Sequence, residues 1–213
     1  MLDKVHRILV LAPHTDDGEF GCGGTIARFI EEGKEVYYAA FSICEESVPD
    51  GFPKDVLQTE MEAATKILGI KSENLFSYRY RVRRFNYDRQ EILEDIIKLR
   101  NKIKPDLVFI PSLNDIHQDH KTIAEEGVRA FKNVTLLSYE LLWNIISFQH
   151  TCFVHLNETH VDKKVQAVQA YKSQQFRSYS SLDFLKSQAR MRGVQVSKNY
   201  AEVFEVVRLH LSL

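Results

Sequence analysis

An apolar run that passes directly into a polar, glycine-rich stretch constrains the fold of this chain more than any other feature. The run is ILVL at residues 8–11, and the stretch PHTDDGEFGCGGT follows at 13–25. A short, uninterrupted apolar run is typical of a strand that is buried on both faces of a parallel sheet. His14, Asp16 and Asp17 would then lie at the carboxyl end of this strand, where open α/β sheets bind their ligands.

The same arrangement recurs in the middle of the chain. A second apolar strand, predicted at 106–111, passes into the polar loop SLNDIHQDH at 112–120, and a helix is expected at 122–131. His117 and His120 are three residues apart at the strand-to-helix boundary, so both imidazoles can face one cavity. The chain therefore places a second group of polar side chains at a strand end.

Together the two polar loops contain the ligand types of a metal site. Zinc accepts imidazole nitrogens and carboxylate oxygens, and a catalytic zinc site needs three protein ligands and one open position. If the two loops follow neighbouring strands, His14, Asp17 and His120 converge as an N, O, N set. Zn²⁺ is the expected ion, and Fe²⁺ could occupy the same donors. Such a site predicts hydrolysis, because the ion polarises a carbonyl oxygen and lowers the pKa of water.

The other polar side chains of these loops are assigned supporting roles. Asp16 is placed to take a proton from the attacking water and to pass it to a leaving amine. A protonated His117 could stabilise the developing oxyanion by charge and hydrogen bonding. Asp119 could orient a ligand imidazole, as carboxylates often do around zinc. The sequence thus predicts a hydrolytic site with Asp16 and His117 as its catalytic groups.

The stretch RYRVRR at 79–84 mixes aromatic and basic side chains. Arg83 and Arg84 are candidates for contacts to a phosphate or sugar of the substrate. The competing interpretation is a strand with one solvated face, because basic and apolar residues alternate along it.

The remaining patterns predict an α/β fold, a single three-layer domain over 1–213 with a mostly parallel, Rossmann-like sheet flanked by helices. The run Gly21 to Gly24 is expected to form a tight turn ahead of the first helix. Strands are expected at 7–11, 34–42, 74–84, 106–111, 134–139, 152–156 and 200–211, with the last near the sheet edge, and helices at 25–32, 55–68, 89–102, 122–131, 159–171 and 179–191.

Composition excludes several other classes of protein. The 28 basic and 29 acidic residues lack the basic excess of a nucleic-acid binder. No apolar stretch reaches the 18 or so residues of a membrane span. The start of the chain indicates a first strand better than a signal peptide, so we expect a cytoplasmic protein. A homo-oligomer is compatible with this sequence. The glycine run matches GxGxxG poorly, so we do not expect a dinucleotide cofactor.

The two polar loops and the glycine-rich stretch resemble those of the PIG-L or LmbE-like deacetylase family. Enzymes of this family use zinc to remove N-acetyl groups from small molecules that contain glucosamine. Its members carry AHPDDE, then GCGGT and a later HxDH, and the counterparts in this chain are PHTDDG, GCGGT and HQDH. The similarity extends through TEMEAATKILGI, KPDLVFIPS, YKSQ and YAEVFEVVR. The resemblance implies the metal ligands His14, Asp17 and His120, the general base Asp16, and His117 as the electrophilic histidine.

Two positions depart from the family motif. Thr15 replaces the usual proline, and Gly18 stands where a glutamate is expected, with Glu19 one position later. The expected function is removal of an N-acetyl group from an N-acetylated amino sugar or sugar conjugate. The segments FNYDRQEIL and PSLNDIHQDH resemble, more weakly, family members of bacterial surface-glycan biosynthesis, so we expect a role in that process. The alternative is a non-catalytic sugar-binding protein of the same fold within a glycan-assembly complex.

Overall fold

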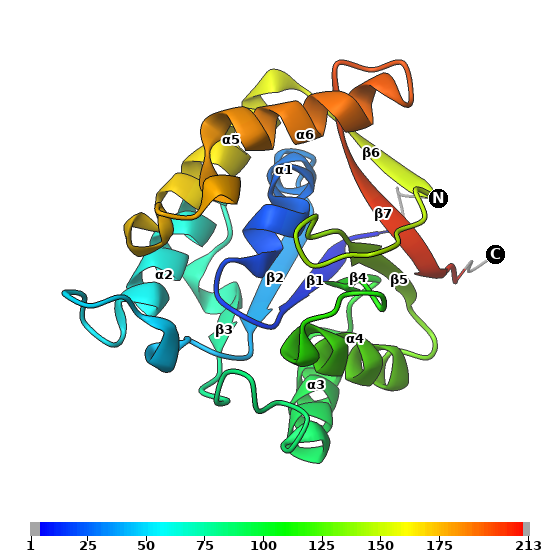
Figure 1. The fold of residues 1–213 in the computed structure, drawn as a ribbon. Helices are drawn as coiled ribbons and strands as arrows, with labels where there is room; N and C mark the ends of the chain where they lie inside the picture. The colour runs from blue at the N-terminus through cyan, green and yellow to red at the C-terminus, as the bar shows by residue number, and fades with distance from the viewer. Residues whose placement is uncertain (1–4, 211–213) are drawn as a thin grey trace.

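Seven strands form one sheet at the centre of the molecule (Figure 1). The computed structural model describes residues 5–210. The spatial order is β3-β2-β1-β4-β5-β7-β6, and β7 pairs antiparallel with both β5 and β6, whereas all other pairs are parallel. The predicted mostly parallel α/β sheet is therefore confirmed. The strands are β1 (Arg7–Ala12), β2 (Glu35–Ala40), β3 (Leu75–Ser77), β4 (Leu107–Pro111), β5 (Thr135–Tyr139), β6 (Cys152–Leu156) and β7 (Tyr200–Arg208).

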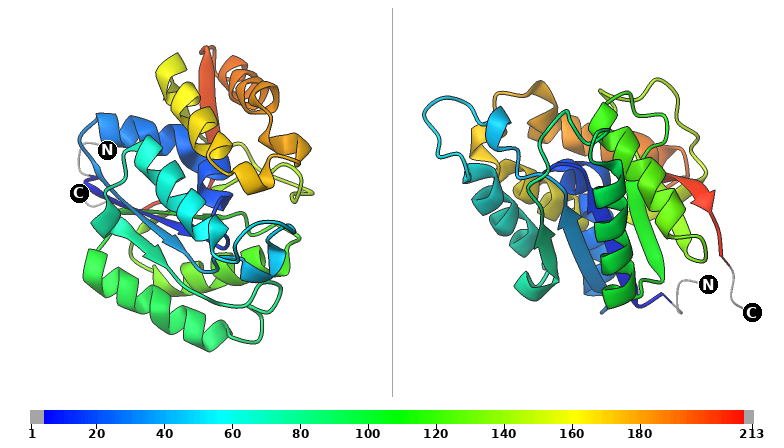
Figure 2. Two further views of the ribbon diagram at one scale, coloured as in Figure 1. Left: turned by 90° about the vertical axis from the view of Figure 1, so that its left-hand side faces the viewer. Right: turned by 90° about the horizontal axis from the view of Figure 1, so that it is seen from below.

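Helices cover both faces of this sheet and complete the three layers (Figure 2). Side chains alternate along β1, so Ile8 and Val10 enter one buried cluster while Leu9 and Leu11 enter another. Helices α1, α2, α5 and α6 pack into the first cluster, and α3 and α4 into the second. The helices are α1 (Asp17–Glu31), α2 (Val56–Leu68), α3 (Arg89–Ile103), α4 (Gln118–Ala130), α5 (Glu158–Gln169) and α6 (Leu182–Val194).

Helix α1 begins eight residues before the predicted start at residue 25, so the predicted tight turn at Gly21 to Gly24 is wrong. These glycines lie inside the helix, which is kinked at Cys22. A Cβ atom at Gly21 would lie 2.3 Å from the ring of Tyr139, and one at Gly24 would lie 2.5 Å from Leu156. The glycines therefore serve the close approach of α1 to the sheet.

The predicted strand over 74–84 is mostly wrong as well. Strand β3 covers three residues, because its partner β2 ends at Ala40. Beyond β3, the N–H of Tyr78 donates to the carbonyl of Ala40, and that of Tyr80 donates to Phe41, just after β2. The alternation itself was informative, since these two tyrosines pack against the core while Arg79 and Arg81 are exposed. A periodic pattern cannot form a strand without a partner.

The C-terminal elements differ from prediction mainly in their bounds. Helix α6 begins at Leu182 after an N-cap at Ser181, three residues later than expected. Strand β7 ends at Arg208, and the predicted last residue, Leu211, lies outside the described residues. Strand β7 lies beside the edge strand β6, close to its predicted place. Among the described helices, none is long and apolar enough to cross a membrane.

A buried ion pair joins β7 and α5 to the middle of α1. Glu202 accepts the backbone N–H groups of Gly24 and Thr25 at 3.0 and 2.7 Å, and Lys164 donates to the same carboxylate at 2.7 Å. Glu202 is 5% exposed and Lys164 is 2% exposed. These contacts lie just after the kink at Cys22, so Glu202 acts as an anionic cap for the second half of α1.

We expect Glu202→Gln to lower the free energy of unfolding by about 3–5 kcal/mol, because it leaves the Lys164 ammonium group buried without a counter-charge. Urea denaturation of the purified variant measures this loss. The matched control is Glu32→Gln, which removes a surface pair with Arg28 and should cost less than about 1 kcal/mol. Equal losses in the two variants would contradict the buried pair as a determinant of stability.

Candidate metal-binding and catalytic site

The two polar loops identified in the sequence meet at the carboxyl ends of β1 and β4. These strands are parallel neighbours, with β2 on the far side of β1 and β5 on the far side of β4. The chain leaves β1 toward α1 and leaves β4 toward α4, on opposite faces of the sheet. A switch of this kind opens a crevice at the strand ends, and ligands bind there in open α/β sheets.

Three side chains converge in this crevice with the spacing of metal ligands. The Nδ1 atom of His14 lies 3.2 Å from Oδ2 of Asp17 and 3.2 Å from Nε2 of His120. The third side of the triangle, between Asp17 Oδ2 and His120 Nε2, measures 3.3 Å. Two ligands of a tetrahedral zinc ion with bonds of 2.0–2.2 Å are about 3.3–3.6 Å apart. These residues therefore fit a metal site, in both donor type and spacing.

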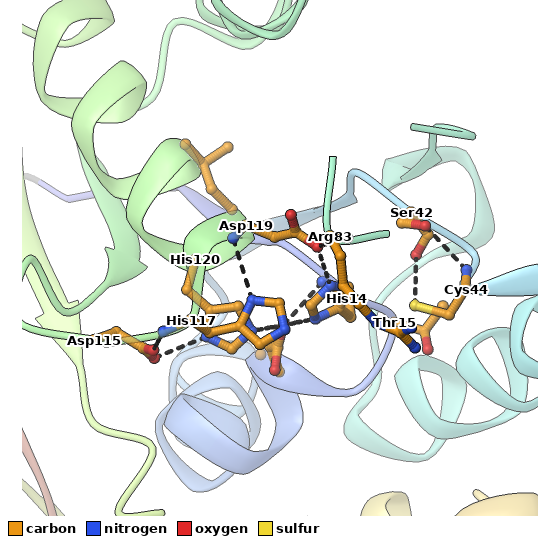
Figure 3. A network of polar contacts seen from close by, with 12 residues as sticks. His14, Thr15, Ser42, Cys44, Arg83, Asp115, His117, Asp119 and His120 are labelled. Carbon is orange, nitrogen blue, oxygen red and sulfur yellow. Dashed lines mark hydrogen bonds and ion pairs between the residues drawn. The ribbon is translucent and has the colours of Figure 1, made fainter. Parts of the chain in front are cut away.

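His117 offers an alternative third ligand. Ring nitrogens of His14, His117 and His120 all lie within 4.8 Å of one another, and the three rings lie next to one another in Figure 3. However, Nδ1 of His117 accepts the backbone N–H of Asp119 at 3.2 Å, as the N-cap of α4. Two candidate ligand sets thus share His14 and His120. The set with Asp17 has the closer spacing.

Each of the shared histidines contacts a further buried carboxylate. Asp119 Oδ2 lies 3.1 Å from Nε2 of His14, and Asp115 Oδ2 lies 2.8 Å from Nδ1 of His120 (Figure 3). Asp119 is fully buried and also accepts the backbone N–H of Arg83. Asp119 thus contacts the imidazole of His14, and its role in orienting a metal ligand stays a prediction. Asp115 was missed, although it lies in the same polar loop, five residues before His120.

The two adjacent aspartates have opposite electrostatic environments. Burial disfavours ionisation of Asp17, but His120 and His14 outweigh it and hold its pKa well below the usual value. Burial and the neighbouring Asp17 raise the pKa of Asp16 to about 6. Asp16 is the N-cap residue of α1, yet its carboxylate makes no capping hydrogen bond and lines the crevice. Neighbouring carboxylates with separated pKa values are suited to different tasks.

His117 is held as a neutral imidazole. Burial and the neighbouring His120 and His14 lower its pKa to about 4. Because its Nδ1 atom accepts the N–H of Asp119, the proton of the neutral ring belongs on Nε2. His117 lines the crevice, so it can act there as a hydrogen-bond donor.

The crevice has a volume of about 300 Å³ and is built by several segments besides the two loops. Arg83 lines it and donates to Ser47 at 3.2 Å, and its contact with a substrate stays a prediction. Arg84 does not line it and instead lies over the exposed ring of Tyr87, 4.5 Å from its centroid.

An aromatic wall of the crevice was missed by the sequence analysis. The rings of Trp143 and Tyr179 stack at 3.8 Å between centroids, and Phe20 meets the Trp143 ring edge-on at 5.1 Å. Arg177, which donates to Gln174 at 2.8 Å, lines the crevice beside them. The only sequence signals were the single tryptophan of the chain and the segment that follows YKSQ.

Several known proteins are similar to this chain in sequence and in fold. The PIG-L family model, described as GlcNAc-PI de-N-acetylase, matches residues 9–131. "Uncharacterized deacetylase YaiS" of Escherichia coli (strain K12) is 31% identical over 178 residues, which cover 80% of this chain and 93% of the relative. "Probable N-acetyl-alpha-D-glucosaminyl L-malate deacetylase 2" of Bacillus anthracis is 25% identical and covers 79% of this chain and 81% of its own length.

Solved structures extend the likeness to almost the whole chain. The N,N'-diacetylchitobiose deacetylase from Pyrococcus horikoshii has a TM-score of 0.82 at 21% identity, over 97% of this chain and 85% of that chain. The conserved protein TT1542 from Thermus thermophilus has a TM-score of 0.79 at 25% identity, over 97% and 96%. The family model matches more than half of this chain, and the Escherichia coli relative is matched over most of both proteins. The chain therefore belongs to the PIG-L family.

Proposed function

We propose that this chain hydrolyses the acetamide of an N-acetylated amino sugar or sugar conjugate, with a zinc ion held by His14, Asp17 and His120. Its family makes it a hydrolytic N-deacetylase. The observation that carries the metal assignment is the triangle of 3.2, 3.2 and 3.3 Å between the three donor atoms. The names of relatives that act on diacetylchitobiose and on an N-acetylglucosaminyl malate support an amino-sugar substrate.

Asp16 would carry the proton transfers of this reaction. A zinc ion in this set supplies Lewis acidity toward a carbonyl oxygen and lowers the pKa of water. Asp16 takes a proton as water attacks the acetamide carbon, and it delivers that proton to the leaving nitrogen as the C–N bond breaks. Acetate and the free amine are the products. The position of Asp16 next to Asp17, with its carboxylate lining the crevice, supports this role.

His117 would stabilise the oxyanion as a neutral donor. The protonated form expected from the sequence would lose the hydrogen bond that Nδ1 accepts from the Asp119 backbone. A neutral ring keeps this bond and still presents an Nε2–H group to the crevice. Preorganised donors of this kind need no rearrangement when negative charge develops on the substrate.

The substrate groups beyond the acetamide would meet the side walls of the crevice. Arg83 is the substrate contact that we retain from the sequence, because it lines the crevice, whereas Arg84 lies elsewhere. The volume of about 300 Å³ suits one sugar residue at a time. Two statements remain predictions from the sequence. One is that residues 1–213 form a single deacetylase domain, and the other is that the protein acts in bacterial surface-glycan biosynthesis.

Asp16→Asn tests the reaction. We expect unchanged zinc stoichiometry and a kcat for acetate release lowered by about 10²–10⁴, because the amide cannot accept the proton. Acetate is measured against a panel of N-acetylated sugars, with bound zinc measured in parallel. Simultaneous loss of zinc would contradict Asp16 as the base. A wild-type protein that binds these sugars and zinc but releases no acetate would favour the non-catalytic sugar-binding alternative.

Asp17→Asn and His117→Gln together decide between the two ligand sets. We expect Asp17→Asn to lose zinc, because one of three donors is weakened, and His117→Gln to keep zinc while kcat falls by about 10²–10³. Zinc content after dialysis and acetate release measure the two effects. Zinc retained by Asp17→Asn and lost by His117→Gln would instead indicate the three-histidine set.

Asp115→Asn tests the support of His120. The carboxylate lies 2.8 Å from Nδ1 of His120, so its loss should weaken zinc binding about 10- to 100-fold. A chelator competition measures the affinity. The control is Asp106→Asn, because Asp106 accepts the backbone N–H groups of His6 and Arg7 at the opposite end of the sheet. Equal zinc affinities in the two variants would remove Asp115 from the site.

A further inference from the structure

The peptide between His14 and Asp16 is held by two buried tyrosines. The carbonyl oxygen of Thr15 accepts hydrogen bonds from the hydroxyl of Tyr38 at 2.9 Å and from that of Tyr171 at 2.7 Å. Tyr38 is fully buried in β2, and Tyr171, which follows α5, is 2% exposed. Two elements distant in sequence therefore restrain the turn that carries the proposed ligands and base.

Glu19 closes these contacts into a network. Its carboxyl group contacts the same two hydroxyls, Tyr38 through Oε2 and Tyr171 through Oε1, the latter at 2.9 Å. Glu19 is fully buried in α1. Each hydroxyl thus lies between Glu19 and the carbonyl of Thr15. We call this unit of Glu19, Tyr38 and Tyr171 the Thr15 clamp.

The clamp depends on the absence of a side chain at residue 18. A Cβ atom at Gly18 would lie 2.4 Å from Cε2 of Tyr38, and the N–H of Gly18 donates to the Tyr38 hydroxyl at 3.1 Å. Any larger residue would push this buried ring away from Thr15. Gly18 is also the position at which the chain departs from the glutamate of the motif it resembles, and the Tyr38 ring leaves no room for a side chain there.

The clamp also restrains the backbone at Thr15, the second position at which the chain departs from the family motif. A proline at residue 15 would fix φ and so stiffen the turn. Thr15 has no such restriction, but two hydrogen bonds to its carbonyl oxygen hold the Thr15–Asp16 peptide that follows. Tertiary contacts thus restrain the turn at a residue whose φ no ring fixes.

We propose that the Thr15 clamp positions His14, Asp16 and Asp17. The clamp residues act through the backbone of Thr15, so they are positioning residues. The inference rests on the proposed function for its catalytic consequence. Its consequence for metal affinity can be measured without any substrate.

Tyr171→Phe and Tyr38→Phe test the clamp, because each removes one hydroxyl and keeps the buried ring. We expect each variant to bind zinc about tenfold more weakly, as when other groups that orient a ligand are removed. We also expect kcat to fall severalfold while KM changes by less than about twofold, since ligand and base geometry change but the walls of the crevice do not. Chelator competition and steady-state acetate release give these two measurements.

The matched control is Tyr139→Phe. Tyr139 is also fully buried, and its hydroxyl donates to the carbonyl of Leu11 at 3.0 Å, inside β1 and outside the turn. We expect a comparable fall in Tm with unchanged zinc affinity. Zinc affinity and kcat in Tyr171→Phe and Tyr38→Phe that match those of Tyr139→Phe would overturn the clamp. A wild-type protein that releases no acetate, with zinc affinity still reduced in the clamp variants, would overturn the proposed function and support the clamp.

Discussion

The parallel pairing of β1 with β4 is the interaction on which the site depends. Their register joins Val10 to Phe109, so the two strands end at the same edge of the sheet. His14 and His120 follow these strands and are separated by 106 residues in the chain, yet their ring nitrogens lie 3.2 Å apart. The chain leaves the two strands on opposite faces, which keeps the space above their ends open for a ligand.

Contacts between carboxylates and imidazoles fix the orientation of the two histidine rings. The same contacts separate the pKa values of Asp16 and Asp17. Asp17 contacts both histidines, while Asp119 and Asp115 each contact one of them from the outer side. The two imidazoles favour the ionised form of Asp17, and the resulting negative charge makes ionisation of Asp16 less favourable. Two adjacent residues of one type thereby acquire opposite pKa shifts, as their proposed roles of base and ligand require.

Helix α1, which begins at Asp17, lies close against the sheet. Gly18, Gly21 and Gly24 admit the side chains of Tyr38, Tyr139 and Leu156 where any Cβ atom would collide. The kink at Cys22 leaves backbone N–H groups that Glu202 satisfies from β7. The same close packing brings the hydroxyl of Tyr38 to the carbonyl of Thr15. Stability of the core and geometry of the turn thus share one cause.

The sequence by itself determined the order of strands and helices and the two polar loops, because uninterrupted apolar runs must be buried and a strand end must then turn. It also predicted His14, Asp17 and His120 as candidate metal ligands and Asp119 as a residue that orients one of them. Only the tertiary structure decided that Gly21 lies inside a helix, that strand β3 ends at Ser77, and that Asp115 contacts His120. Each of these depends on contacts between residues distant in the chain, which local periodicity does not encode.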